Sequence, residues 1–289
     1  MRPTVLVLAL LVLTCPRSVG AADVSGQFAV KGGRTIVPKY AAAFESRDGR
    51  NPRQTTVEVV LSAEPIDLEA AVAALVPHTQ VINQDALMRH DYILLWVRPD
   101  GHVSVNATLG DTMTQYVDAL GDNLSAQIAT NTADRVSGRV FTPKPVTVMG
   151  GDTYTLDVTF TVRVARAASG TPLGAGGGPP GQALQGLDGA ITRKDWAALQ
   201  AGLTPDTLAR FDNSYDSVAE KADNAADALR AWLPKSALEV TGGTLRDDVA
   251  DLEVVGEMFP GQSALYLARM RKSGPTWQLE SASVVGMLP

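Results

Sequence analysis

The chain has 289 residues, which is enough for about two domains. Hydrophobic residues make up 45% and charged residues 19%, a composition typical of a folded globular protein rather than a disordered one. The formal net charge is −6 and aromatic residues account for only 6%. Since nucleic-acid binding favours a basic surface and aromatic platforms, we expect no nucleic-acid partner.

The first 22 residues are predicted to be a signal peptide. Arg2 precedes an unbroken apolar run at 5–13, and small residues follow up to position 22. This order of regions is typical of a secretory signal, and the apolar run is too short to span a bilayer. We expect cleavage after residue 21 or 22, giving an exported protein, periplasmic or extracellular, without a transmembrane segment.

Cys15 is the single cysteine of the chain, and it lies inside this leader. Cleavage would leave a mature protein without a thiol, so disulfides, cysteine-ligated metal and thiol catalysis would be excluded. An alternative is that residues 12–15 form a lipoprotein signal, in which Cys15 is lipidated and anchors the protein to a membrane.

Residues 23–166 are predicted to form an all-β domain, a sandwich or a barrel. About eight strands at regular intervals are typical of these architectures. The strongest patterns are two hairpins and one long alternating strand, at 27–37, 92–107 and 153–164.

Three stretches of this domain have weaker signals. Residues 67–75 are predicted to be a short helix with Asp67 as its N-cap. Residues 123–142 are predicted to be β, and the secondary structure of 112–121 is left open.

Residues 167–183 contain no charged side chain and read AASGTPLGAGGGPPGQA. The glycine cluster suggests a phosphate loop, but that motif has no prolines in its turn, and Pro179 and Pro180 argue against it. We expect a flexible Gly/Pro linker.

Residues 184–289 show helices first and strands afterwards, which predicts an α+β domain with three helices and a four-stranded antiparallel sheet. Thr204 and Pro205 are predicted to start the second helix as N-cap and N1. Ser217 and Glu220 fit a capping box for the third, whose buried stripe is predicted to comprise Val218, Ala222, Ala225, Leu229 and Trp232. Strands are expected near 237–241, 248–257, 263–271 and 276–285.

Two short motifs of this domain resemble the NTF2-like (cystatin-like) superfamily: ITRKDWAAL at 191–199 and GPTWQL at 274–279. The resemblance covers residues 184–289 and implies a sheet curled around helices into a cone with an apolar mouth, often paired as a homodimer. It implies no reaction, because this fold hosts both enzymes and inert binding modules. The N-terminal domain is loosely similar, at 26–30 and 60–65, to uncharacterised β-rich domains of bacterial exported proteins.

The sequence offers no convergent catalytic or metal-binding set. His78, His90 and His102 are spaced twelve residues apart, which does not match the short spacings of metal ligands on one element. We therefore expect no metal, no cofactor and no catalytic residue.

Large apolar residues of the C-terminal domain are the candidates for a ligand-binding mouth, although most are expected to be core. They are Trp196, Phe211, Trp232, Met258, Tyr266 and Trp277.

The sequence favours an exported, non-catalytic binding protein whose C-terminal cone binds a protein partner or a small apolar ligand. The alternative is an NTF2-like enzyme, an isomerase or similar, acting on a hydrophobic small molecule. It would use Asp251, Glu257 or Glu280 as base with Tyr266 as donor. Strand alternation argues against this, because it directs Asp251 and Glu253 away from the helices and towards solvent.

Overall fold

The computed structural model describes residues 23–77, 90–110, 114–118, 121–148, 151–212 and 217–289. Strands account for 52% and helices for 21%, which confirms a mainly β chain with an α+β portion. The predicted signal peptide, Cys15 and His78 lie outside the described residues. Within the ranges above, no helix combines the length and the apolarity needed to cross a membrane.

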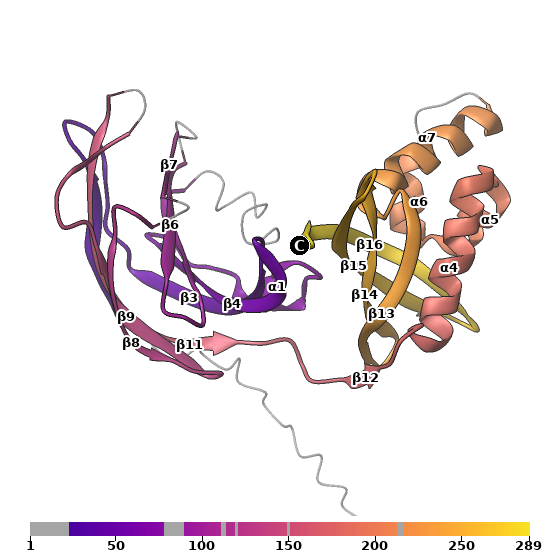
Figure 1. Cartoon of the computed structure of the whole chain (residues 1–289), viewed down its shortest axis with the longest axis horizontal. Helices are drawn as coiled ribbons and strands as arrows, with labels where there is room; N and C mark the ends of the chain where they lie inside the picture. Colours follow the sequence, from indigo (N-terminus) through magenta and orange to yellow (C-terminus); the bar gives the residue numbers. More distant parts are fainter. Residues whose placement is uncertain (1–22, 78–89, 111–113, 119–120, 149–150, 213–216) are drawn as a thin grey trace, which may run out of the picture.

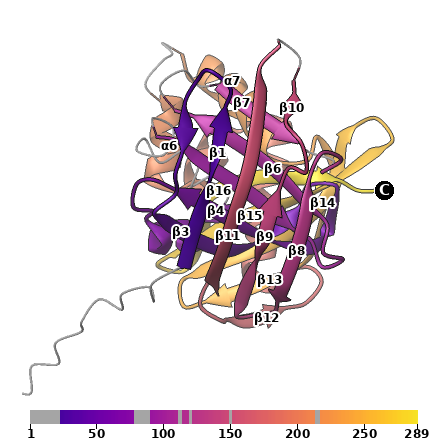
Figure 2. The same ribbon diagram turned by 90° about the vertical axis from the view of Figure 1, so that its left-hand side faces the viewer.

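The N-terminal part, residues 23–165, consists of two layers of strands that face each other (Figures 1 and 2). The first layer contains β1 (Asp23–Val30), β2 (Thr35–Ile36), β8 (Ser125–Asn131), β9 (Arg135–Phe141), β10 (Val146–Thr147) and β11 (Thr153–Ala165). The second contains β3 (Tyr40–Asp48), β4 (Asn51–Ser62), β5 (Tyr92–Val97), β6 (Val103–Leu109) and β7 (Thr114–Asp118). Neighbouring strands pair antiparallel, except that the end of β11 pairs parallel with β3 and joins the layers.

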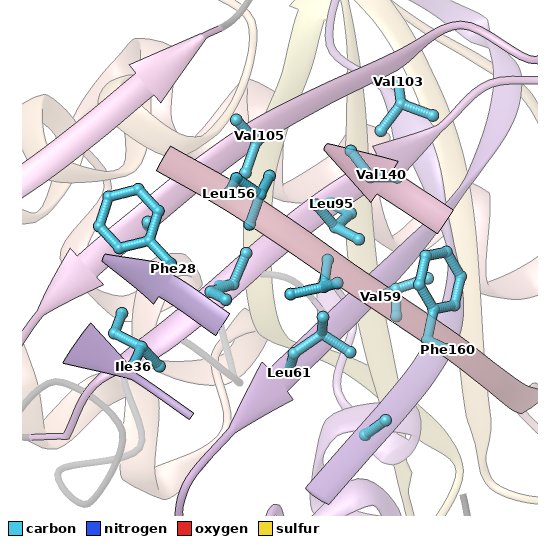
Figure 3. Close-up of a cluster of buried hydrophobic side chains, with 14 of the residues drawn as sticks. Phe28, Ile36, Val59, Leu61, Leu95, Val103, Val105, Val140, Leu156 and Phe160 are labelled. Atoms are coloured by element: carbon cyan, nitrogen blue, oxygen red, sulfur yellow. The ribbon is translucent and has the colours of Figure 1, made fainter. Parts of the chain in front are cut away.

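The core of the N-terminal part lies between these layers. Figure 3 shows Phe28, Leu156 and Phe160 of the first layer packed against side chains of β4 and β5. The alternation expected for β11 is confirmed, because Tyr154, Leu156, Val158 and Phe160 are all buried.

The outer face of β3, β4 and β5 carries a second apolar cluster beneath α1 (Leu68–Ala73). Asp67 caps this helix by accepting a hydrogen bond from the Ala70 N–H at 3.0 Å, as expected. The described part of 112–121 contains the strand β7.

The prediction of a flexible linker at 167–183 is wrong from residue 171 onwards. Thr171–Leu173 form β12, which pairs with β13, and α4 (Gly178–Arg193) already begins in the glycine-proline cluster. The residue before this helix, Gly177, adopts a left-handed φ of 64°, and proline fits the first turn of a helix, where its missing N–H needs no partner. The same prolines that argue against a phosphate loop therefore start a helix.

The C-terminal part, residues 171–289, is a five-stranded sheet with helices on one face (Figure 1). After α4 come α5 (Trp196–Gly202), α6 (Pro205–Asp212) and α7 (Val218–Trp232), so the described residues of this part form four helices where three were expected. The sheet continues with β13 (Ser236–Arg246), β14 (Val249–Phe259), β15 (Gln262–Ser273) and β16 (Thr276–Met287).

The capping box of α7 is confirmed, with Ser217 and Glu220 each bonding the backbone of the other. The buried stripe of α7 holds at Ala222, Ala225 and Leu229, whereas Trp232 is only partly buried against the same core and Val218 is 63% exposed. Val218 is the first residue of the helix.

The two faces of the C-terminal sheet have different surroundings. Ala250, Leu252 and Val254 on β14 face the helices and are fully buried, as the alternation predicts. The prediction that Asp251 and Glu253 face solvent is wrong, because the opposite face of the sheet lies against the N-terminal part. Asp251 and Glu253 on that face each form an ion pair with an arginine, and the Glu253 side chain also remains 37% exposed.

Candidate functional site

A cavity of about 730 Å³ lies between the N-terminal and C-terminal parts. One wall is the outer face of β3, β4 and β5 with the end of α1, and the other is the helix-free face of β13 to β16. This volume falls in the range of small-molecule sites, which commonly lie where two structural units meet.

Four side chains on the N-terminal wall form a row across neighbouring strands. Ala165 on β11 pairs with Phe44 on β3, Phe44 pairs with Glu58 on β4, and Glu58 pairs with Trp96 on β5. Directly opposed residues of paired strands point to the same face with their side chains close together. All four residues line the cavity, so a carboxylate stands there between two aromatic rings.

Glu58 is only 2% exposed, which is unusual for a glutamate. The adjacent residue Val59 points into the core between the layers, and alternation therefore directs Glu58 to the outer face. Phe44 on the same face is 1% exposed and belongs to the apolar cluster under α1. The carboxylate thus lies on the largely dehydrated floor of the cavity.

The C-terminal wall carries a compact ion cluster around Asp251. Arg269 donates from Nε to Oδ1 at 2.6 Å and from Nη2 to Oδ2 at 2.9 Å, and Arg246 also binds Oδ2. Leu267, two residues from Arg269 on β15, adds an apolar surface to the same wall.

Contacts between the two parts hold the cavity walls in position. Arg47 on β3 forms an ion pair with Glu253 on β14. Arg269 also donates from Nη1 to the carbonyl of Ala73, at the end of α1, at 2.6 Å. Gly286 on β16 lies close to Gly49 and Pro52, at the turn between β3 and β4.

The chain segment that joins the two parts also lines the cavity. Residues 165–170 contribute to the lining, and Arg166 is held by an ion pair with Glu45 of β3 at 3.0 Å. The joining segment is therefore fixed to the N-terminal wall.

The six residues predicted to form an apolar mouth lie elsewhere. Phe211 and Tyr266 are buried in the C-terminal core, and the others pack against it: Trp196, Trp232, Met258 and Trp277. The rings of Phe211 and Trp232 are in contact, with centroids 5.8 Å apart. None of the six lines the cavity between the two parts.

The residues of the enzyme alternative are not brought together. Tyr266 faces the helices, where burial raises the pKa of its hydroxyl, whereas Asp251 faces the N-terminal part. Glu280 makes a bidentate pair with Arg271 at 2.9 and 3.0 Å. Glu257 accepts from Ser236 Oγ at 2.6 Å and from the Gly261 N–H, and these hydrogen bonds lower the pKa of its carboxyl.

Sequence reasoning missed Glu58. Its signal is a single acid in the β-branched run TTVEVVLS, at a position that the pairing places between Phe44 and Trp96. The aromatic neighbours come from other strands, so the strand pairing has to be known before the row is visible.

Among the described residues, no group of three or more His, Cys, Asp or Glu side chains could hold a metal ion. Comparisons of the chain with protein-family models, with curated proteins and with solved structures find no match.

Proposed function

We propose that this chain is an exported, non-catalytic binding protein that holds a small molecule in the cavity between its N-terminal and C-terminal parts. The observation that carries the proposal is the cavity itself, about 730 Å³, with walls from both parts. Apolar surfaces from Trp96, Leu267 and Val284 alternate with ion pairs in its lining, a combination suited to an amphipathic ligand.

The architecture supports the domain assignments made from the sequence. The two facing strand layers support a β-sandwich-like N-terminal domain, and helices followed by an antiparallel sheet support an NTF2-like C-terminal domain. In this proposal the ligand site lies on the helix-free face of the sheet, and the apolar residues on the helix side serve as core. A homodimer through the C-terminal domain is a separate proposal, which light scattering tests.

Binding of a neutral phenylnaphthylamine dye to the chain expressed from residue 23 tests the function. We expect saturable binding with a rise in dye fluorescence, because the dye moves from water to an apolar cavity. A Ser283→Trp substitution, on the cavity wall, should abolish it by filling the space. The matched control Ser273→Trp, at the exposed end of β15, should bind as the wild type does.

Equal dye binding by both tryptophan variants would contradict the proposed site, and no saturable binding by the wild type would contradict the function. Export is tested separately by N-terminal sequencing of the mature protein. A start at Ala22 or Asp23 supports a cleaved signal peptide, and a blocked start at Cys15 supports the lipoprotein alternative.

A further inference from the structure

We propose that the two parts of the chain form a clamp, which opens and closes at residues 167–170 and which a ligand in the cavity holds closed. This inference rests on the proposed function and adds how the cavity admits and retains its ligand. It starts from the position of the cavity, whose walls belong to different parts of the chain (Figure 1). Opening of the clamp would separate Trp96 on one wall from Leu267 on the other.

Residues 167–170 have the properties of a hinge. The residue before them is held to the N-terminal part, because Arg166 forms an ion pair with Glu45 on β3 at 3.0 Å. The residue after them is held to the C-terminal part, because Thr171 on β12 pairs with Leu245 on β13. The sequence AASG between these two anchors forms neither helix nor strand. Hinges are commonly a few loop residues that absorb changes in the backbone dihedral angles, and small side chains leave room for such changes.

Each part has an apolar core of its own, so each can move as one body. Among the described residues, the three clusters of buried apolar side chains are each confined to one part of the chain. Two clusters lie within residues 24–165 and one lies within residues 173–287. A rotation of one part against the other therefore leaves the contacts inside each cluster intact.

Two of the contacts that hold the parts together are polar and can be exchanged for contacts with water. The side chains of the Arg47–Glu253 ion pair are 29% and 37% exposed, and a pair of this kind shifts an equilibrium by up to about fivefold. Arg269 donates a hydrogen bond to the carbonyl of Ala73, and water can take its place when the parts separate. Relative motion is the default expectation where the interface between two domains is polar and small.

A ligand in the cavity would shift the equilibrium towards the closed form. A molecule that touches both walls makes its full set of contacts only when the clamp is closed, and it contacts one wall alone when the clamp is open. The difference in its affinity for the two forms sets how far the population shifts.

Double electron–electron resonance between two spin labels measures this opening. Cys15 is the single cysteine of the chain, so the protein expressed from residue 23 can be labelled at introduced cysteines alone. Suitable positions are Gln115→Cys on β7 and Gln262→Cys on β15, which are both exposed. Figure 1 shows β7 away from the segment that joins the parts, and Gln262 lies at the end of its sheet opposite to β12.

Without ligand, we expect a component at a shorter, closed distance and a second component at a longer, open distance. The neutral phenylnaphthylamine dye, at ten times its dissociation constant, should reduce the open component about tenfold relative to the closed one. The control pair Gln200→Cys and Gln262→Cys has both labels in the C-terminal part. It should give one distance that the dye does not change.

The double variant Ala167→Gly/Ala168→Gly tests the position of the hinge. Glycine adds backbone freedom, which favours the open form, because the joining segment is less restricted there. We expect the ratio of open to closed form to rise about fivefold, and dye binding to weaken in proportion to the loss of the closed form. The control Ala133→Gly, at an exposed position in the turn after β8, should change neither.

A distance distribution that saturating dye leaves unchanged would overturn the clamp, whereas the binding of the dye itself would leave the proposed function standing. A wild-type ratio of open to closed form in Ala167→Gly/Ala168→Gly would overturn the assignment of the hinge to residues 167–170. Failure of the dye to bind at all would instead contradict the proposed function, so the two failures are distinguishable.

Discussion

Arg47 on β3 forms an ion pair with Glu253 on β14, two residues 206 positions apart in the chain. The pair joins the N-terminal and C-terminal parts beside the cavity, and its side chains remain 29% and 37% exposed. Because solvent screens such a pair, it contributes up to about 1 kcal/mol to stability. Its main effect is to set the relative position of the two walls.

A double-mutant cycle measures this contribution. Arg47→Met and Glu253→Gln should each lower the free energy of unfolding slightly, with a coupling energy of about 0.2–1 kcal/mol from urea titrations. The coupling should shrink in high salt. A coupling of zero at low salt would show that the two side chains do not interact in solution.

Asp251→Asn should destabilise the protein more than loss of the Arg47 pair. The substitution leaves Arg269 and Arg246, whose side chains are 12% and 21% exposed, without their carboxylate. We expect a loss of about 2–3 kcal/mol in the free energy of unfolding, measured by urea denaturation. The control Glu239→Gln, at an exposed position of β13, should leave stability unchanged, and an equal effect of both substitutions would contradict the prediction.

Gly286→Val should disturb the contact between the two parts. A Cβ at this position would lie 2.7 Å from the Gly49 carbonyl oxygen and 2.8 Å from Cγ of Pro52, which is closer than packed atoms approach. We expect a loss of about 1–3 kcal/mol in stability together with weaker dye binding.

A glycine substitution without such neighbours provides the control for Gly286→Val. Gly186 is exposed on α4 and has nothing near its Cβ position, so Gly186→Ala should raise stability by about 0.5–1 kcal/mol and keep dye binding. Unchanged dye binding in Gly286→Val would show that the cavity does not depend on this contact.

Stability should fall in alkaline solution because of Tyr154. Burial, with a smaller contribution from the charge of Asp118, raises the pKa of its hydroxyl from 10.0 to about 12. Between these values the unfolded chain loses the proton and the folded protein keeps it, so folding stability is full below pH 10 and is lost as pH rises towards about 12.

Unfolding free energies measured across this alkaline range test the prediction. Tyr154→Phe should make the fall less steep, since it removes one of the buried tyrosine hydroxyls whose pKa is raised. The control Tyr40→Phe, at a position that is 44% exposed, should keep the wild-type slope. If the free energy of unfolding of Tyr154→Phe fell with pH as steeply as that of the wild type, groups other than Tyr154 would cause the loss of stability.

Local signals in the sequence predicted most of the secondary structure. The capping box at Ser217 and Glu220 and the alternation along β11 act over a few residues, so a single segment carries the information. The glycine-proline cluster at 174–181 led to the wrong prediction of a linker. Gly and Pro are typical of linkers, but they also occur at the start of a helix such as α4, which begins at Gly178.

The candidate site could not be predicted in the same way. Alternation correctly turned Asp251 and Glu253 away from the helices, but it cannot say whether water or another part of the chain lies beyond. Glu58, Phe44 and Trp96 meet only through the pairing of three strands, and the facing wall comes from residues 244–285, in the other part of the chain. Contacts between strands and between the two cavity walls depend on tertiary packing, which no single segment of the sequence encodes.

The end of β11 pairs with β3 at Val164 and Ala165, and the chain then crosses to β12 within a few residues. Residues 165–170 connect the two parts and also line the cavity. Their number is therefore constrained both by the distance between β11 and β12 and by the shape of the cavity. An inserted residue there would slide the second wall past the first and change the outline of the binding space. Adaptation to a different ligand would therefore be achieved more simply by exchanging side chains on the sheets than by altering the crossing.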